Sequence, residues 1–233
     1  MRFSLVIPMY NEESILPATL KTVSDFFKDE DCEILFVNDG STDKSAKIVS
    51  VFSKETDQKI RLCGYDVNKG KGAAVRCGIE NAKGDIIVYT DADLAYGTEP
   101  VLKAVLDLEI FGDDMLIGSR NLTNDGYEGY TFLRKIASKT YIRVLNIAAG
   151  FKLSDSQCGF KAFKRDCAKE VFSLCKTDGF AFDIEAILIA QKKGKKIREL
   201  PVSVINHRQS KVHVFRDTLR MLRDVMKIKK NIP

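Results

Sequence analysis

Closely spaced cysteine pairs are missing from this sequence, and histidines are scarce. The six cysteines include no C-x-x-C pair, and the two histidines lie far from most of them along the chain. A structural zinc site and a disulfide framework are therefore not expected, whereas ordinary reduced thiols are. The cysteines stand at positions 32, 63, 77, 158, 167 and 175.

Long apolar runs are missing as well. No stretch approaches the roughly 18 uncharged apolar residues that a membrane-spanning helix needs. The first residues, MRFSLVIPMYNEE, become polar too early for a signal peptide. We therefore expect a cytoplasmic protein.

An excess of positive charge is confined to the end of the chain. The net charge is +5, but residues 206–233 carry eight Lys or Arg against two Asp, so the remainder is slightly acidic. No aromatic platform is interleaved with these basic residues, so we expect no nucleic-acid partner. Residues 214–230 separate apolar from basic positions, which predicts an amphipathic helix. Docking on the sheet is its simpler interpretation, and peripheral contact with an anionic membrane is the second.

Strand-like runs alternate with helical patterns through the first half of the chain. The strands are nearly continuous in Val, Ile and Leu, which predicts βαβ units and an α/β fold whose mostly parallel sheet has helices on both faces. With 45% hydrophobic residues and no repeats, the 233 residues are expected to form a single domain. The expected strands are FSLVI, CEILFVND, KIRLCGY, DIIVYTD and DMLIGSR, and the expected helices span about 12–28, 43–54, 71–82 and 98–110.

The loops after these strands are the informative segments, because ligands of parallel α/β sheets bind beyond the carboxyl ends of the strands. The five loops read PMYNEE, NDGSTD, DVNKGKG, TDADLAYG and GSRN, and they supply acids, amides, glycines and bases to one rim. The third loop continues as NKGKGAAVRCG, which fits neither the P-loop pattern nor G-x-G-x-x-G, because Val75 replaces the third glycine. A P-loop and a dinucleotide-binding Rossmann fold are therefore not expected.

Asp91 and Asp93 follow the fourth strand one residue apart and repel each other unless a cation lies beside them. They could be solvated acids that bind nothing, or the nucleophile and acid of a haloacid-dehalogenase-type phosphatase. The phosphatase interpretation prefers Thr or Val where Ala95 stands and places its motif on the first strand. The third interpretation is Mg²⁺ or Mn²⁺ held together with a ligand's phosphates, and the polar rim favours it.

Five motifs in one order resemble family 2 glycosyltransferases of the GT-A fold: VIPMYNEE, VNDGSTD, NKGKGAAVRCGIENAKGDIIVYTDADL, IGSR and DSQCGFKAFKR. Within the family the chain is most similar to dolichyl-phosphate glucosyltransferases, with dolichyl-phosphate mannose synthases as near relatives. The resemblance covers about residues 3–211. It implies an inverting, metal-dependent transfer of a hexose, with glucose from UDP-glucose as the first choice, to a polyprenyl or dolichyl phosphate. A family member that acts on a sugar hydroxyl and a non-catalytic nucleotide-binding module are the alternatives.

The resemblance also implies roles for single residues on the donor side. Pro8, Tyr10 and Glu12 are expected around the base and ribose of the nucleotide. Asp39 is expected to hydrogen-bond the base, and Lys71 to line the nucleotide side of the cleft. Asp91 and Asp93 are expected to hold the ribose and the metal, with Asp93 the stronger candidate for the metal. The donor half is expected over about residues 1–120.

The acceptor half is expected over about 121–211, and the basic helix over 212–233. The resemblance implies that Arg120 and Arg134 match positions that receive the acceptor phosphate. Arg208 and Lys211 resemble a late segment that closes over the diphosphate. Asp155 stands where enzymes acting on hydroxyls carry a catalytic base. Because a lipid phosphate arrives already anionic, we expect Asp155 to orient the acceptor loop or an arginine instead.

Overall fold

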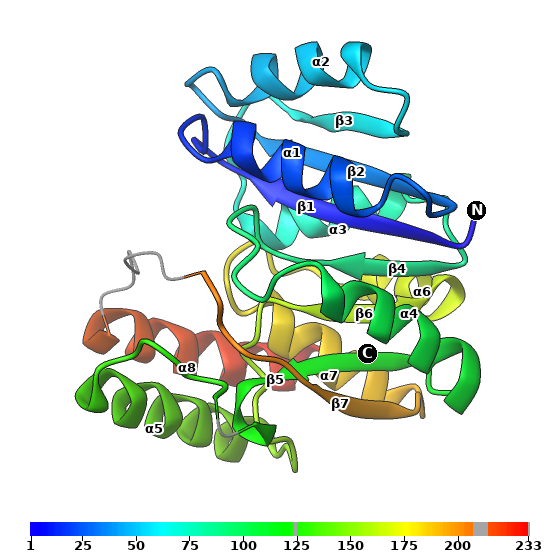
Figure 1. The fold of residues 1–233 in the computed structure, drawn as a ribbon. Coiled ribbons are helices and arrows are strands. Elements are labelled where there is room, and N and C mark those ends of the chain that lie inside the picture. The colour runs from blue at the N-terminus through cyan, green and yellow to red at the C-terminus, as the bar shows by residue number, and fades with distance from the viewer. Residues whose placement is uncertain (124, 207–213, 233) are drawn as a thin grey trace.

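The computed structural model describes residues 1–123, 125–206 and 214–232, and the side chains of 133, 134 and 214–220 lie outside its description. Seven strands form one sheet in the order β3-β2-β1-β4-β6-β5-β7 (Figure 1). All neighbouring strands are parallel except that β6 is antiparallel to both β4 and β5. The strands are β1 (Phe3–Met9), β2 (Cys32–Asp39), β3 (Ile60–Tyr65), β4 (Ile86–Tyr89), β5 (Met115–Ser119), β6 (Lys161–Lys164) and β7 (Ile197–Pro201).

Helices cover both faces of this sheet, which confirms the predicted α/β class. The five expected strands and the four helices between them all form. The helices are α1 (Leu16–Phe26), α2 (Ser45–Glu55), α3 (Lys71–Asn81), α4 (Glu99–Phe111), α5 (Phe132–Ala149), α6 (Arg165–Leu174), α7 (Phe182–Lys192) and α8 (Val214–Asn231), with a 3-10 turn η1 (Arg120–Leu122) after β5.

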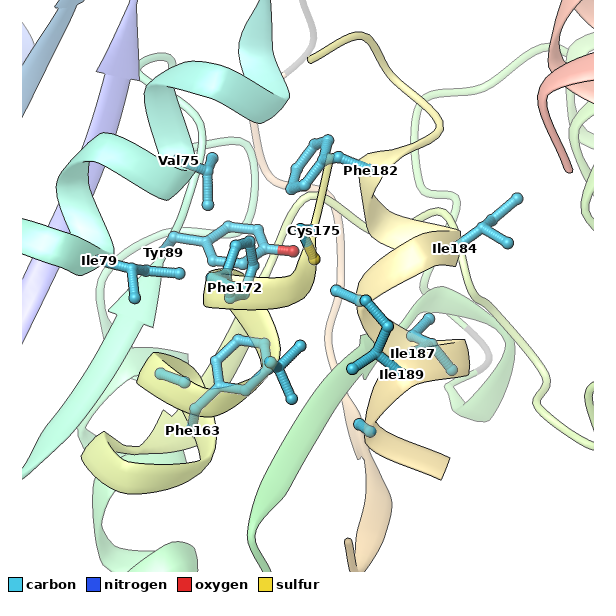
Figure 2. Close-up of a cluster of buried hydrophobic side chains, with 14 of the residues drawn as sticks. Val75, Ile79, Tyr89, Phe163, Phe172, Cys175, Phe182, Ile184, Ile187 and Ile189 are labelled. Atoms are coloured by element: carbon cyan, nitrogen blue, oxygen red, sulfur yellow. The ribbon is translucent and has the colours of Figure 1, made fainter. Parts of the chain in front are cut away.

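Two hydrophobic cores lie on opposite faces because successive side chains of a strand point to opposite sides. In β1, Phe3, Leu5 and Ile7 enter the core shared with α1 and α4, whereas Val6 enters the core shared with α3, α6 and α7. Every residue of β1 is buried. Figure 2 shows the second core, in which side chains of α3, α6 and α7 surround Tyr89 of β4. Burial on both faces explains the uninterrupted apolar strands in the sequence.

The predicted C-terminal helix forms as α8, but its docking differs from the expectation. It packs against α5 and α7, side by side with α5 (Figure 1), rather than on the sheet. Val225 and Ile228 are buried, whereas Met226 is 64% exposed. Side chains of α7 already share the buried core with those of β4, β5 and β6 on this face of the sheet. No helix in the described residues is long and apolar enough to cross a bilayer.

Candidate active site

The loops after β1, β2 and β4 meet at one rim, as the parallel strands predict. Asp39, at the end of β2, is almost fully buried and holds the loop before α3. Its carboxylate accepts hydrogen bonds from the backbone of Lys69 (2.9 Å) and Gly70 (3.0 Å) and from the Asn68 side chain (2.9 Å). Asp39 therefore fixes the shape of this loop.

The glycines of NKGKG allow two backbone segments to lie close together. The Gly72 N–H donates to the carbonyl of Asp178 (2.7 Å) at the start of α3. A Cβ on Gly70, whose φ is +112°, would lie 2.5 Å from the same carbonyl, and one on Gly72 would lie 2.4 Å from the carbonyl of Thr177. Because residues 177 and 178 occupy this place, the loop differs from a phosphate-cradling P-loop.

Lys71 and Asp91 form an ion pair across the rim, with Nζ 2.5 Å from Oδ1. Burial alone would lower the pKa of Lys71, but the carboxylates of Asp91 and Asp183 outweigh it, so the pKa lies above its usual value. A Cβ on Gly159 would lie 2.2 Å from Asp91 Oδ2, so a larger residue there would displace the Asp91 carboxylate. Asp91 thus lies between the start of α3 and the segment that leads into β6.

The turn that carries Asp93 is strained. Leu94 has a φ of +47°, in the left-handed region that a branched side chain rarely adopts, and its side chain is buried. The Ala95 N–H donates to Asp93 Oδ1 (3.1 Å), and Asn206 Nδ2 donates to the carbonyls of Asp93 (3.1 Å) and Leu94 (3.0 Å). A backbone outlier held by surrounding contacts is typical of a functional site.

The donor atoms at this rim fit a divalent cation that shares its ligands with a substrate. No cluster of three or more His, Cys, Asp or Glu side chains suitable for a metal occurs in the described parts of the chain. Mg²⁺ commonly takes one or two carboxylates and completes its shell with phosphate oxygens and water. Asp93 and Asp91 supply hard oxygen ligands of this kind, whereas a site built from protein groups alone would need more of them.

A buried ionic network behind the rim was not foreseen from the sequence. Lys161, at the start of β6, is fully buried, and its Nζ donates to Asp183 Oδ1 (2.6 Å) and to the carbonyl of Cys158 (2.8 Å). The Tyr89 hydroxyl donates to the same carboxylate. Burial and this carboxylate raise the pKa of Tyr89 well above its usual value. A single Lys in the apolar run GFKAF was the available signal, but its partner is 22 residues away.

Arg120 and Asp155 form the second charged pair of the site. Arg120 Nε lies 2.7 Å from Asp155 Oδ2 and Nη2 lies 3.0 Å from Oδ1, a bidentate geometry, and the Arg120 backbone N–H adds a 3.2 Å bond. Asp155 is fully buried. Burial would lower the pKa of Arg120, but Tyr96 and Asp155 raise it well above its usual value. Glu199 of β7 in turn accepts the backbone N–H groups of Ser154 (2.9 Å) and Asp155 (3.0 Å).

A cavity of about 710 Å³ adjoins Arg120 between α5, α8 and the segment that joins α6 to α7. The joining segment also forms the Asp178 and Thr177 contacts with the start of α3, so it borders both the cavity and the donor rim. Glu185 fixes this segment by accepting the backbone N–H groups of Lys176 (3.0 Å) and Thr177 (2.7 Å). The lining includes Arg120, Gln157, Ser138, Tyr141, Ile142, Leu174, Lys176, Phe180, Glu185, Met221, Asp224, Lys227 and Ile228.

The remaining donor-side candidates lie after β1. Pro8 is buried within the strand, and Tyr10, directly after it, is 44% exposed. The Glu12 N–H donates to Ser45 Oγ (2.8 Å), which ties this loop to the start of α2. The structure thus brings these residues to the rim that carries Asp39.

Three candidates, one for the acceptor phosphate and two for the donor diphosphate, are not placed by the structure. Arg134 belongs to α5, but its side chain lies outside the description. Arg208 and Lys211 lie outside the described residues. Their roles stay predictions from the sequence.

Residues 4–172 match the glycosyl transferase family 2 model, and the chain belongs to this family. It is therefore a glycosyltransferase. Curated relatives include the dolichyl-phosphate beta-glucosyltransferases of Drosophila melanogaster, 31% identical over 98% of this chain and 74% of the relative, and of Homo sapiens, 30% identical over 98% and 75%. The resemblance stated from the motifs is confirmed.

Solved structures support the predicted GT-A fold. Glucosyl-3-phosphoglycerate synthase from Mycobacterium tuberculosis, in complex with Mn²⁺, UDP and phosphoglyceric acid, has a TM-score of 0.72 at 21% identity, covering 100% of this chain and 79% of that chain. Mannosyl-3-phosphoglycerate synthase from Rubrobacter xylanophilus has a TM-score of 0.68 at 19% identity, covering 99% and 73%. At these identities the likeness concerns the fold.

Proposed function

We propose that this glycosyltransferase moves glucose from UDP-glucose to a polyprenyl or dolichyl phosphate with inversion at the anomeric carbon. The observation that carries the proposal is the pairing of Arg120 with Asp155. Both oxygens of this buried carboxylate are engaged, so it is poorly suited to remove a proton from an acceptor hydroxyl. A phosphate acceptor needs no such base, since its second ionisation lies near pH 6.

On the donor side, Tyr10 would contact the base as an exposed aromatic ring beside Pro8. Asp39 would hydrogen-bond the base while keeping its loop closed, and Glu12 would lie near the ribose. Asp91 would contact the ribose, because Lys71 already neutralises one of its oxygens. Lys71 itself, held protonated by its carboxylate neighbours, would lie beside the diphosphate.

A divalent cation, Mg²⁺ or Mn²⁺, would be held by Asp93 with help from Asp91. When bound, it would neutralise charge on the departing nucleoside diphosphate. The solved glucosyl-3-phosphoglycerate synthase complexes contain Mn²⁺ or Mg²⁺ together with UDP, which supports this assignment. Arg208 and Lys211 would close over the diphosphate.

On the acceptor side, Arg120 would bind the phosphate. Asp155 engages Nε and Nη2, so the phosphate would bind through Nη1, while Asp155 holds the guanidinium in place. Lys176 and Lys227 line the same cavity and would add positive charge, and Arg134 is a further candidate. The apolar lining suits the first units of a polyprenyl chain. Contact with the cytoplasmic face of a membrane, aided by the basic α8, would follow from such an acceptor.

The test is a transfer assay that offers donors and acceptors in parallel. UDP-glucose, UDP-N-acetylglucosamine and GDP-mannose are each incubated with Mg²⁺ and dolichyl phosphate, undecaprenyl phosphate or 3-phosphoglycerate. We expect a lipid-linked glucose from UDP-glucose, and loss of the product with chelator. Transfer to 3-phosphoglycerate without transfer to either lipid phosphate would overturn the proposal in favour of a hydroxyl acceptor.

A further inference from the structure

Helix α5 exposes an unusual number of apolar side chains. Phe132 is 77% exposed and Ile147 is 71% exposed, and Ile136 and Val144 are also more than one-third exposed. The spacing of four, eight and three residues between neighbours keeps all four on one side of the helix. We call this set, with Lys135, Lys139 and Arg143, the α5 face.

The inner side of α5 is already occupied, so the α5 face is an additional surface. Ile142, Leu145 and Ala149 are buried on the opposite side, where α5 packs against α8. Lys229 of α8 donates to the carbonyl of Ala148 (2.9 Å), which fastens the two helices side by side (Figure 1). The helix therefore keeps two apolar sides, one covered by the protein and one exposed.

The charges around the exposed apolar residues have one sign. Helix α5 contains four basic residues and no acidic residue over its 18 positions. Lys135, Lys139 and Arg143 follow one another at intervals of four, so they form one edge of the α5 face. On neighbouring α8, Arg223 and Lys230 are exposed, as is Met226.

We propose that the α5 face docks on an anionic lipid bilayer. A helix with apolar residues on one side and basic residues along its edge is suited to the membrane interface, where the apolar side chains enter the acyl boundary and the cations meet lipid phosphates. A second copy of the chain fits less well. In a two-fold contact the same surface meets itself, so the basic residues of both copies would share one interface to which α5 brings no acidic partner.

This docking rests on the proposed function for its purpose, although the contact itself is tested separately. Tyr141 and Ile142 of α5 and Met221 and Ile228 of α8 line the cavity beside Arg120. Because these α5 residues lie on the side opposite to the α5 face, docking would place α5 between the bilayer and the cavity, as one wall of the cavity. Docking through the α5 face would thus keep the cavity beside Arg120 next to the membrane that contains the lipid phosphate.

The experiment compares two matched double variants in vesicle co-sedimentation. Ile136→Glu with Ile147→Glu changes side chains that are 48% and 71% exposed, and Leu106→Glu with Ile110→Glu changes side chains of α4 that are 47% and 69% exposed. Vesicles contain phosphatidylcholine with or without phosphatidylserine. We expect wild type and the α4 variant to bind the anionic vesicles, more weakly at high salt, and the α5 variant to bind about tenfold more weakly or worse.

Several results would overturn the docking. These are no binding of wild type at low salt, equal binding to both vesicle types, equal loss in both variants, or a wild-type dimer in gel filtration that the α5 substitutions dissociate without vesicles. Transfer to a short, water-soluble polyprenyl phosphate, measured without vesicles, is expected to be unchanged in both variants. If wild type lacks this transfer, the proposed function fails, while the vesicle results still decide on the α5 face.

Discussion

The donor rim and the helix pair α5–α8 differ in how their side chains find partners. At the rim, charged groups find their partners within the protein: Asp39 accepts backbone N–H groups of its loop, and Lys71 pairs with Asp91. In the helix pair α5–α8, apolar and basic side chains face outward. A site for a small, water-soluble ligand can be complete within the protein. A site for a lipid substrate also needs an exposed apolar surface that can contact the membrane in which the lipid is dissolved.

The largest effect is expected from Asp93→Ala on the donor side. We expect transfer to fall about a thousandfold, about 4 kcal/mol of transition-state stabilisation. In a thermal shift assay, UDP with Mg²⁺ or Mn²⁺ should raise the melting temperature of wild type through binding to the folded state. The variant should lose the metal-dependent part and keep its binding to the anionic vesicles. If UDP stabilised both proteins equally with and without chelator, Asp93 would not be a metal ligand.

Lys161→Met tests the buried network that lies between the two regions. Removing one member of a buried ion pair leaves Asp183 uncompensated, so we expect the free energy of unfolding to fall by about 3 kcal/mol. Chemical denaturation measures this value. Lys103→Met, at an exposed position of α4, is the control and should change it by less than about 0.5 kcal/mol. A loss for Lys161→Met as small as that of the control would show that the pair contributes little.

Arg120→Lys tests whether Arg120 contributes to acceptor binding and not to donor binding. A lysine cannot make the bidentate contact with Asp155 and also present a planar donor group to a phosphate. We expect KM for the lipid phosphate to rise between about tenfold and a hundredfold, with UDP binding unchanged. Steady-state kinetics and a UDP titration separate the two effects. An equal loss of UDP affinity would place Arg120 on the donor side.

Asp155→Asn is the companion to that experiment. Because Asp155 is proposed to act through Arg120, transfer should stay within about tenfold of wild type, below the 10²- to 10⁴-fold typical of a lost general base. The pH profile should keep its shape. A loss of a thousandfold or more in a folded variant, with a changed basic limb of the pH profile, would favour a hydroxyl acceptor.

The smallest effect is expected from thiol reagents. Burial raises the pKa of Cys158 to about 11 and that of Cys32 and Cys167 to about 12. Since the thiolate is the reactive form, these groups should resist alkylation at pH 7.5. Mass spectrometry after iodoacetamide treatment measures the labelling, with denatured protein as the control. Rapid labelling of Cys158 in the native protein would contradict its burial beside the site.

The first half of the fold was predictable because β1, β2, β4 and β5 are buried on both faces. Such strands are continuous in apolar residues, and the helices between them show a clear period. The second half gives weaker signals. Strand β6 has four residues and begins with Lys161, and β7, IRELP, mixes charged with apolar positions. Helix α7 carries Asp183 and Glu185 on buried positions, which hides its apolar face.

Some residues of the candidate site could likewise be predicted from the sequence, whereas others could not. Asp39, Lys71, Asp91 and Asp93 could be found because each lies at the end of a strand or between a strand and the first turn of the next helix. The partners of Asp91 could not, since Gly159 is brought to it only when β6 joins the sheet. The pairing of Arg120 with Asp155 joins residues 35 positions apart, and the sequence named both without indicating that they touch.

The position of β6 has a consequence for biosynthesis. This strand comes from residues 161–164, yet it lies between β4 and β5, which are made earlier. During translation, about seventy residues are added after β4 before its neighbour β6 has been made. At common elongation rates this takes several seconds. Until then β4 presents an open, apolar edge of the kind that aggregates. We therefore expect the segment 1–120, made alone, to be insoluble, and the order of synthesis to make the nascent chain dependent on chaperones.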